Sequence, residues 1–307
     1  MKLSADQVQT KEVLDWKGVH LLNFSQSSCS QKVRILLSEK GVDYHSHEID
    51  LTKAEHIRPW FLGINSRGVV PVLVHDGDVY VESNDILRYI DKTFHSTGFS
   101  WIPDGDENQK LVDKLLQLED DLHDDLRVVT MGFLVPHKAA KKTDAELEAY
   151  AQNGLDDPYR AKQIAWWRAF GEHGITTTQA EEAVVNFHHA FSELNAIVKD
   201  RNWLLGDNPT VLDIAWFITL HRVISAGFPL GNYPALNCLY KRMKARPSFH
   251  KEIKKGPVFI QVVGVVYRFF RRLKGTSLKA VYQLLGGRVD PALAARSGSS
   301  VDDRQRL

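Results

Sequence analysis

The chain has 307 residues, of which 43% are hydrophobic and 25% charged, and a formal net charge of +1. This length accommodates two domains, and the composition is that of a folded globular protein, which excludes a largely disordered chain. With only two cysteines, Cys29 and Cys238, a disulfide framework is excluded, so we expect a reducing, cytoplasmic environment. The sequence shows neither an apolar run long enough to span a bilayer nor a signal-peptide core, so neither is expected.

The first third of the sequence alternates between strand and helix patterns after a polar lead-in, residues 1–17. Strand patterns cover residues 19–24, 44–49, 70–75 and 79–82, and helix patterns cover residues 28–40, 54–63 and 84–94. The Asp-Gly pair at 76–77 predicts a hairpin. Pro71 cannot donate to a strand ladder, so it must lie at a strand start or in a special turn. A β-α-β unit followed by β-β-α predicts a thioredoxin-like α/β domain over residues 18–95.

The rest of the chain reads as helical after a linker, residues 96–105. An all-helical domain is expected over residues 106–255, with helices at 109–126, 180–199 and 211–224. Two capping boxes are predicted, one formed by Thr178 and Glu181 and the other by Thr210 and Asp213. The helix at 211–224 is almost wholly apolar and should be central. Cys238, among leucines and Tyr240, is expected in the core.

Residues 241–288 contain 13 lysines and arginines but a single acidic residue, Glu252. Within this region, residues 256–288 form a basic amphipathic extension, and residues 289–307 have a composition typical of a disordered tail. One interpretation of the extension is a helix lying on an anionic membrane surface. The interpretation we favour is a helix packed back over the active-site cleft or onto the dimer partner, with its arginines reaching solvent.

The most informative stretch is the polar turn between the first strand and the first helix, residues 23–30. It places Ser27, Ser28 and Cys29 at the start of a helix, where unpaired N–H groups and the helix dipole favour an anion, in particular a thiolate. Ser25, Ser27 or Ser28 could equally be a plain N-cap. Cys29, Val33 and Leu36 share one helical face, so Cys29 also reads as a small buried hydrophobic residue.

Motifs over residues 18–250 together resemble those of cytosolic glutathione transferases. The run Ser27-Ser28-Cys29-Ser30 followed by Lys32-Val33-Arg34 resembles the active-site turn of the zeta class, which includes maleylacetoacetate isomerases, and of related reductive dehalogenases. Val70-Pro71 with Glu82-Ser83 resembles the family's glutathione-binding motifs, and residues 206–213 resemble its helix-capping motif. Trp60-Phe61 and residues 65–71 resemble bacterial β-etherases. Each motif alone is a weak signal, but their shared order and spacing make a strong one.

The resemblance implies the glutathione transferase fold, with glutathione as co-substrate. Ser27, or Ser28 as second choice, is then expected to donate a hydrogen bond to the glutathione thiolate, which favours its charged form. A cis bond before Pro71 would expose the Val70 backbone to the cysteinyl part of glutathione. Glu82 and Ser83 would hold the γ-glutamyl group, although a plain helix cap also explains this pair.

The resemblance to reductive dehalogenases implies that Cys29 resolves a glutathionyl adduct of the substrate. Conjugation, β-ether cleavage and reductive removal of a halide remain open, because the zeta isomerases also carry this cysteine. A zeta-like cis–trans isomerase is the nearest alternative; it usually needs basic residues, and Lys32 and Arg34 are the only ones near the turn. A third alternative is a non-catalytic or membrane-associated protein that binds glutathione.

The expected partners are glutathione and a hydrophobic or aromatic small molecule bound between the domains. Residues 128–167 are long for the family and rich in aromatic side chains, which suggests a large aromatic substrate, although ordinary helix packing explains them as well. A homodimer is expected from the resemblance alone. The 13 histidines show no metal-binding spacing, so we expect no metal site, and we expect no nucleic-acid partner.

Overall fold

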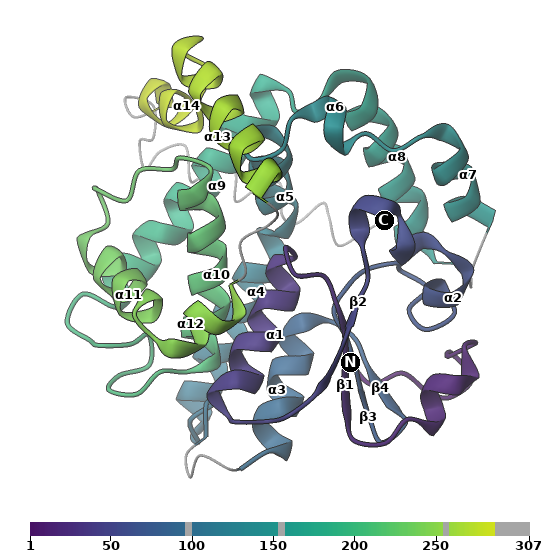
Figure 1. Ribbon diagram of the computed structural model, residues 1–307. Helices are drawn as coiled ribbons and strands as arrows, with labels where there is room; N and C mark the ends of the chain where they lie inside the picture. The colour runs from purple at the N-terminus through teal and green to yellow at the C-terminus, as the bar shows by residue number, and fades with distance from the viewer. Residues whose placement is uncertain (96–99, 153–156, 254–257, 286–307) are drawn as a thin grey trace.

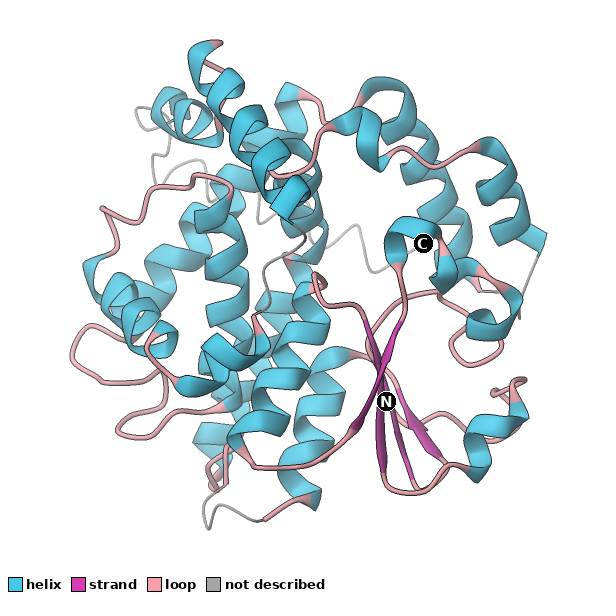
Figure 2. Cartoon of the chain, viewed as in Figure 1, coloured by secondary structure: helices cyan, strands magenta, loops and turns pink. Residues whose placement is uncertain are grey.

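The computed structural model describes residues 1–95, 100–152, 157–253 and 258–285. A small sheet domain packs against a larger helical domain, as the cartoon in Figure 2 shows. The sheet has the order β2-β1-β3-β4, in which β1 is parallel to β2 and antiparallel to β3, and β3 is antiparallel to β4. The strands are β1 (Val19–Asn23), β2 (His45–Glu48), β3 (Val72–His75) and β4 (Asp78–Tyr80). This is the thioredoxin-like sheet predicted from the sequence.

The two faces of the sheet are covered by different helices. Leu21 and Leu73 belong to the core shared with α1 (Ser28–Glu39), α3 (Ser83–Thr93) and the helical domain. Leu22 and Val72, one position along each strand, belong to the core on the opposite face, as the two-residue repeat of a strand requires. The short helices in this half of the chain are η1 (Lys11–Asp15), η2 (Leu51–Lys53), η3 (Glu55–Ile57) and α2 (Pro59–Leu62).

The polar lead-in, residues 1–17, is part of the sheet domain, so the predicted boundary at residue 18 is wrong. Lys2 forms a bridge to Tyr80 of β4, and the Leu3 N–H donates to the carbonyl of Val79. Val8 and Val13 are fully buried in the core on the outer face of the sheet. Two isolated valines carry no periodicity, which is why a sequence pattern does not reveal this packing.

The predicted hairpin and the special backbone at Pro71 are both confirmed. Asp76 and Gly77 have φ values of 49° and 86°, as the tight turn between β3 and β4 requires. A Cβ on Gly77 would lie 2.1 Å from the carbonyl oxygen of Leu14, so glycine is needed there for space as well. The Val70–Pro71 peptide bond is cis, immediately before β3.

The helical domain is built around α10 (Val211–Ser225), whose side chains are buried along most of its length. The Thr210–Asp213 capping box that starts this helix is confirmed. The other helices of the domain are α4 (Asp106–Asp121), α5 (His123–Phe133), α6 (His137–Ala140), α7 (Asp144–Gln152), α8 (Pro158–His173), α9 (Thr177–Ile197), α11 (Pro234–Lys244) and α12 (Pro247–Glu252).

Three predictions for this domain are wrong in detail. The single helix expected at 109–126 is in fact two helices, because the helical conformation is interrupted at Leu122 and α5 starts at His123. The capping box of α9 uses Thr176 and Gln179 rather than Thr178 and Glu181, because α8 ends at His173 and α9 already begins at Thr177. Cys238 is exposed rather than in the core, since α11 turns its leucines inward and Cys238 outward.

The predicted linker holds the two domains together rather than separating them. Residues 96–99 lie outside the described part, but Trp101 is buried in the common core. The Asp91 carboxylate of α3 accepts hydrogen bonds from the backbone N–H groups of Trp101 and Ile102, both at 2.9 Å.

Part of the aromatic-rich region, residues 128–167, packs against the sheet domain. Tyr150 and Ile164 join Ile57 and Leu62 in a small separate core, and the Tyr150 hydroxyl donates to the carbonyl of Arg67 at 2.7 Å. Arg160 donates to the carbonyl of Ser66 at 3.1 Å. These contacts give part of the region a packing role, and a substrate-binding role for its other aromatic side chains stays a prediction.

The C-terminal extension forms α13 (Val258–Leu273) and α14 (Leu278–Leu285), which lie beside α5 and α9 (Figure 1). In this single chain α14 packs against α9 and buries Leu278 and Tyr282, whereas the apolar side of α13 is exposed. Packing of the extension on a dimer partner stays a prediction. The expected disordered tail, residues 289–307, lies outside the described residues. Within those residues, every helix falls short of the length or apolar character that a membrane crossing requires.

Candidate active site

Ser27, Ser28 and Cys29 lie together on the first turn of α1, as the sequence predicted. Ser27 is the N-cap, and its hydroxyl oxygen accepts a hydrogen bond from the Ser30 N–H at 3.3 Å. Capping uses the oxygen only, so the hydroxyl proton remains available to a second acceptor. The plain-cap interpretation of Ser27 is therefore correct and is compatible with a role as a donor.

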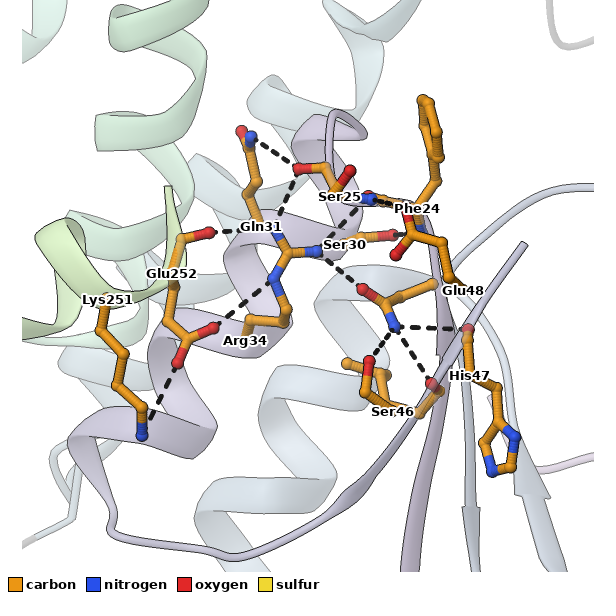
Figure 3. A network of polar contacts seen from close by, with 12 residues as sticks. Phe24, Ser25, Ser30, Gln31, Arg34, Ser46, His47, Glu48, Lys251 and Glu252 are labelled. Carbon is orange, nitrogen blue, oxygen red and sulfur yellow. Dashed lines mark hydrogen bonds and ion pairs between the residues drawn. The ribbon is translucent and has the colours of Figure 1, made fainter. Parts of the chain in front are cut away.

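Arg34 and Gln31 hold this turn in place through hydrogen bonds (Figure 3). The Arg34 guanidinium donates to Asn23 Oδ1 at 2.8 Å and to the Ser25 carbonyl at 2.9 Å. It also donates to the carbonyl of Glu252 at 3.0 Å, which ties the turn to the end of the helical domain. The Gln31 amide donates to the same Ser25 carbonyl at 3.1 Å. These contacts make Arg34 a residue that shapes the turn rather than one that awaits a substrate.

Cys29 is paired with a histidine that the sequence analysis did not identify. The half-buried sulfur lies 3.9 Å from both ring nitrogens of His123, the first residue of α5. Burial opposes ionisation of the thiol, but the charges of His123 and Lys32 outweigh it and lower the pKa of Cys29 from 9.0 to about 7. The Cys29 sulfur in turn raises the pKa of His123 to about 9, against the effect of burial. These shifts favour a thiolate beside an imidazolium for this pair above about pH 7.

Lys32, one turn further along α1, is buried and fully bonded. Its Nζ lies 2.7 Å from Glu119 Oε2 and 3.1 Å from Asn84 Oδ1. Thr219 of α10 donates to the other Glu119 oxygen at 2.8 Å. Burial opposes ionisation of Glu119, yet Lys32 keeps the pKa of this carboxyl below its ordinary value. The charge of Lys32 therefore helps to lower the pKa of Cys29, and its hydrogen bonds hold it in place between the two domains.

Arg222 of α10 is a further cation close to the same turn. Its guanidinium donates to the Gln26 carbonyl. Burial lowers the pKa of Arg222, and the nearby Cys29 sulfur opposes that decrease. Among the residues that the structure describes, no carboxylate forms an ion pair with Arg222. The Cys29 thiolate is thus the nearby negative charge that faces both His123 and Arg222.

The residues expected to bind glutathione lie at two places where the backbone is irregular. Val70 precedes the cis bond to Pro71, and Ser83 is the first residue of α3. Glu82 has a φ of 65°, an uncommon conformation for a residue with a side chain, and such strain concentrates at binding sites. Glu82 is also paired with Arg67, whose Nη1 lies 2.6 Å from Glu82 Oε1.

The residues that sequence reasoning missed all come from the helical domain. Glu119, His123 and Arg222 are contributed by α4, α5 and α10, and each reaches the start of α1 from a distant part of the sequence. No spacing or motif marks them. The basic residues considered near the turn, Lys32 and Arg34, are instead bonded within the protein.

Two cavities lie away from this turn. One, of about 80 Å³, is lined by residues that include Trp166 and Ile175. The other, of about 160 Å³, is lined by residues that include His173, Tyr267 and Arg271. Neither is lined by Cys29 or by the residues expected to bind glutathione. Across the described ranges, no group of three or more His, Cys, Asp or Glu side chains could hold a metal ion.

Comparison with known proteins agrees with this geometry. Residues 26–93 match the glutathione S-transferase N-terminal domain, and residues 177–248 match the C-terminal domain. A tetrachloro-p-hydroquinone reductive dehalogenase from Sphingobium chlorophenolicum is 30% identical over 243 residues, which cover 75% of this chain and 94% of that protein. Protein LigF from Sphingobium sp. strain SYK-6 is 27% identical over 243 residues, covering 76% of this chain and 93% of LigF.

The fold is likewise shared with solved structures. The crystal structure of the β-etherase LigF from the same Sphingobium strain has a TM-score of 0.64 at 23% identity, covering 78% of this chain and 99% of that one. Glutathione is the co-substrate of this family and is bound in solved structures that share the fold. The matched domains, their order and the dehalogenase relative together establish that this chain belongs to the glutathione S-transferase family.

Proposed function

We propose that this protein uses the glutathione thiolate to displace a halide from an electrophilic aromatic ring, and that Cys29 then removes the glutathionyl group. The observation that carries this proposal is the Cys29–His123 pair at the start of α1, with its 3.9 Å contact and a thiol pKa of about 7. A cysteine that only fills space needs no cation beside it. The similarity to a tetrachloro-p-hydroquinone reductive dehalogenase supports the same reaction class.

In the first step, glutathione binds with its sulfur at the start of α1. The Ser27 hydroxyl, with Ser28 as the alternative, donates to the sulfur and favours the thiolate. The Val70 backbone pairs with the cysteinyl part, and Glu82 and Ser83 hold the γ-glutamyl group. The thiolate attacks the ring carbon, a carbon–sulfur bond forms, and halide leaves with the bonding electrons.

In the second step, the Cys29 thiolate attacks the glutathione sulfur of the adduct. A disulfide forms between Cys29 and glutathione, the carbon–sulfur bond breaks, and its electron pair stays on the ring carbon, which takes a proton from the His123 imidazolium. A second glutathione thiolate attacks the mixed disulfide and releases Cys29. The net reaction consumes two glutathiones and gives the reduced ring, halide and glutathione disulfide.

Glutathione conjugation or β-aryl ether cleavage is the second candidate. Ser27 alone is sufficient for either, because its hydroxyl proton remains available at the cap, and the relative LigF is a β-etherase. In that case Cys29 is not needed for turnover. A zeta-like isomerase that works on a maleyl keto acid is the remaining enzymatic alternative, and a glutathione-binding protein without catalysis is the non-enzymatic one. A homodimer and a cytoplasmic location stay predictions.

Calorimetric titration with glutathione, followed by product analysis, separates these candidates. The native chain, Ser27→Ala and Cys29→Ala are each assayed with a chlorinated hydroquinone, an aryl β-ether and a maleyl keto acid. The proposal predicts that Cys29→Ala converts the chlorinated hydroquinone into a glutathionyl adduct and stops there. If Cys29→Ala turns over as the native chain does, the resolving role is excluded and the productive substrate identifies the reaction. Absence of glutathione binding would contradict any enzymatic reading.

A further inference from the structure

The outward side of α13 is made up mainly of apolar side chains. Six of them are 46–66% exposed: Val262, Val265, Val266, Phe269, Phe270 and Leu273. We refer to these six as the α13 apolar face. They follow one another at intervals of three and four residues, so they lie on one side of the helix. Soluble chains rarely leave so continuous an apolar surface uncovered, and such surfaces mark interaction sites.

Polar contacts on the opposite side of α13 fix this orientation. The Tyr267 hydroxyl donates to the carbonyl of Gly132 in α5 at 2.9 Å. The Arg271 guanidinium lies 4.4 Å from the centre of the Phe133 ring and donates two hydrogen bonds to the Thr276 carbonyl, at 2.7 and 3.0 Å. Rotating the helix to bury its apolar face would break all of these contacts.

The next helix anchors the pair to the protein body. In α14, Leu278 and Tyr282 are buried against the α9 side of the helical domain, and the Tyr282 hydroxyl accepts from Asn232 Nδ2 at 2.9 Å. The extension is therefore a firmly attached helical pair with one uncovered side, at the edge of the molecule in Figure 1.

The charges around the α13 apolar face indicate what kind of partner this face binds. From Val258 to Leu285 the sequence has five lysines and arginines and neither aspartate nor glutamate. Three of these cations, Arg272, Lys274 and Lys279, are exposed. A second copy of this chain would bring two acid-free cationic surfaces together, which is repulsive. An anionic bilayer offers both an apolar interior for the face and negative headgroups for the cations.

We propose that α13 is a membrane-surface helix that docks this protein on anionic lipid. The α13 apolar face enters the boundary between headgroups and acyl chains, while Arg272, Lys274 and Lys279 contact the headgroups. The helix lies in the plane of the membrane, because no described helix can cross it. This role goes beyond the proposed reaction and does not depend on it, since the face is separate from the residues around Cys29.

Vesicle flotation of the full chain tests the proposal. The probes are vesicles of phosphatidylcholine alone and with about 30% phosphatidylserine, at low and high salt. Two double variants are compared with the native chain: Val265→Ser with Phe269→Ser, and Arg272→Ser with Lys274→Ser. Trp60→Ser is the matched control, because Trp60 is an exposed aromatic residue, 41% accessible, on the sheet domain. Circular dichroism and the rate of Cys29 alkylation verify that each variant is folded.

The expected result is salt-sensitive binding to the anionic vesicles, weakened at least about tenfold by either double variant and unchanged by Trp60→Ser. No binding of the native chain to anionic vesicles at low salt would overturn the proposal. It would also be overturned if sedimentation showed a dimer that Val265→Ser with Phe269→Ser dissociates while vesicle binding is retained. The apolar face would then be an interface between copies.

Discussion

Helices α1 and α13 are both amphipathic, yet the fold uses them in opposite ways. The apolar residues of α1 are buried, and so are its cations Lys32 and Arg34, each of which is bonded to an acceptor. In α13 the polar residues Tyr267 and Arg271 contact the body, and the apolar side is left exposed. The partners of the polar side chains, rather than apolar content, decide which side of each helix is covered.

The two helices therefore differ in whether the residues that matter for function also contribute to the stability of the fold. Around α1, the residues that hold the two domains together are the same residues that set the charge on Cys29. The α13 apolar face takes no part in the described core, so it can be changed without loss of the fold. The following four predictions test this contrast, from the largest expected effect to the smallest.

Removing Lys32, one of the two buried cations of α1, should be the most destabilising of these changes. Lys32→Met leaves the Glu119 carboxylate buried without its ion-pair partner, and we expect the free energy of unfolding to fall by about 3–5 kcal/mol in urea titration. Lys162→Met is the control, because Lys162 is exposed and pairs with exposed Asp124 at 3.3 Å, a contact expected to contribute under about 1 kcal/mol. Equal effects of the two substitutions would contradict the account.

Alanine substitution of two leucines in the C-terminal extension should change the free energy of unfolding by very different amounts. Leu278→Ala in α14 removes a fully buried side chain and should lower the free energy of unfolding by about 2–5 kcal/mol. Leu273→Ala in α13 removes an exposed one and should change it by less than about 0.5 kcal/mol. A large loss in Leu273→Ala would mean that the apolar face is covered in solution.

The charge on Cys29 should depend on His123. In a Cys238→Ser background, the rate of iodoacetamide alkylation should rise with pH through an apparent pKa of about 7, because only the thiolate reacts. His123→Gln removes the imidazolium, so the apparent pKa should increase by about one unit, equivalent to about 1.4 kcal/mol, and alkylation should slow at neutral pH. An unchanged pH profile of alkylation would show that His123 does not lower the pKa of Cys29.

Ser27→Ala should destabilise the protein less than Lys32→Met or Leu278→Ala. Loss of the N-cap should cost about 1 kcal/mol of unfolding free energy, and glutathione turnover should fall as well if the hydroxyl donates to the sulfur. Ser27→Thr keeps both the cap and the donor, so it should restore stability and turnover together. If Ser27→Ala lowers stability alone, Ser28 becomes the donor to test.

Much of the fold follows from local sequence patterns. The Asp-Gly turn, the Thr210–Asp213 box and the strand-helix alternation are all short-range signals, and the structure contains each of them. Ser27, Ser28 and Cys29 were identifiable for the same reason, since they are adjacent in the sequence and fall on one helical turn. The cis bond at Pro71 was expected from the family resemblance.

What escaped prediction depends on contacts across long sequence separations. His123 and Arg222 meet the turn only because α10 packs against α1 and α5 packs against α10, and neither residue belongs to a motif. Val8 and Val13 are buried by the sheet without a periodic pattern. For α13, periodicity defines two sides of the helix, but which side faces the protein is set by Gly132 and Phe133, more than 130 positions away from their partners.

The most direct test of the proposed chemistry is intact-mass analysis of the native protein, quenched with acid during turnover of glutathione and a chlorinated hydroquinone. The account predicts one glutathione attached to the protein through a reducible disulfide that maps to Cys29, and its absence in Cys29→Ser. Steady turnover with no such adduct, and with no glutathione disulfide formed as halide is released, would contradict the resolving role of Cys29.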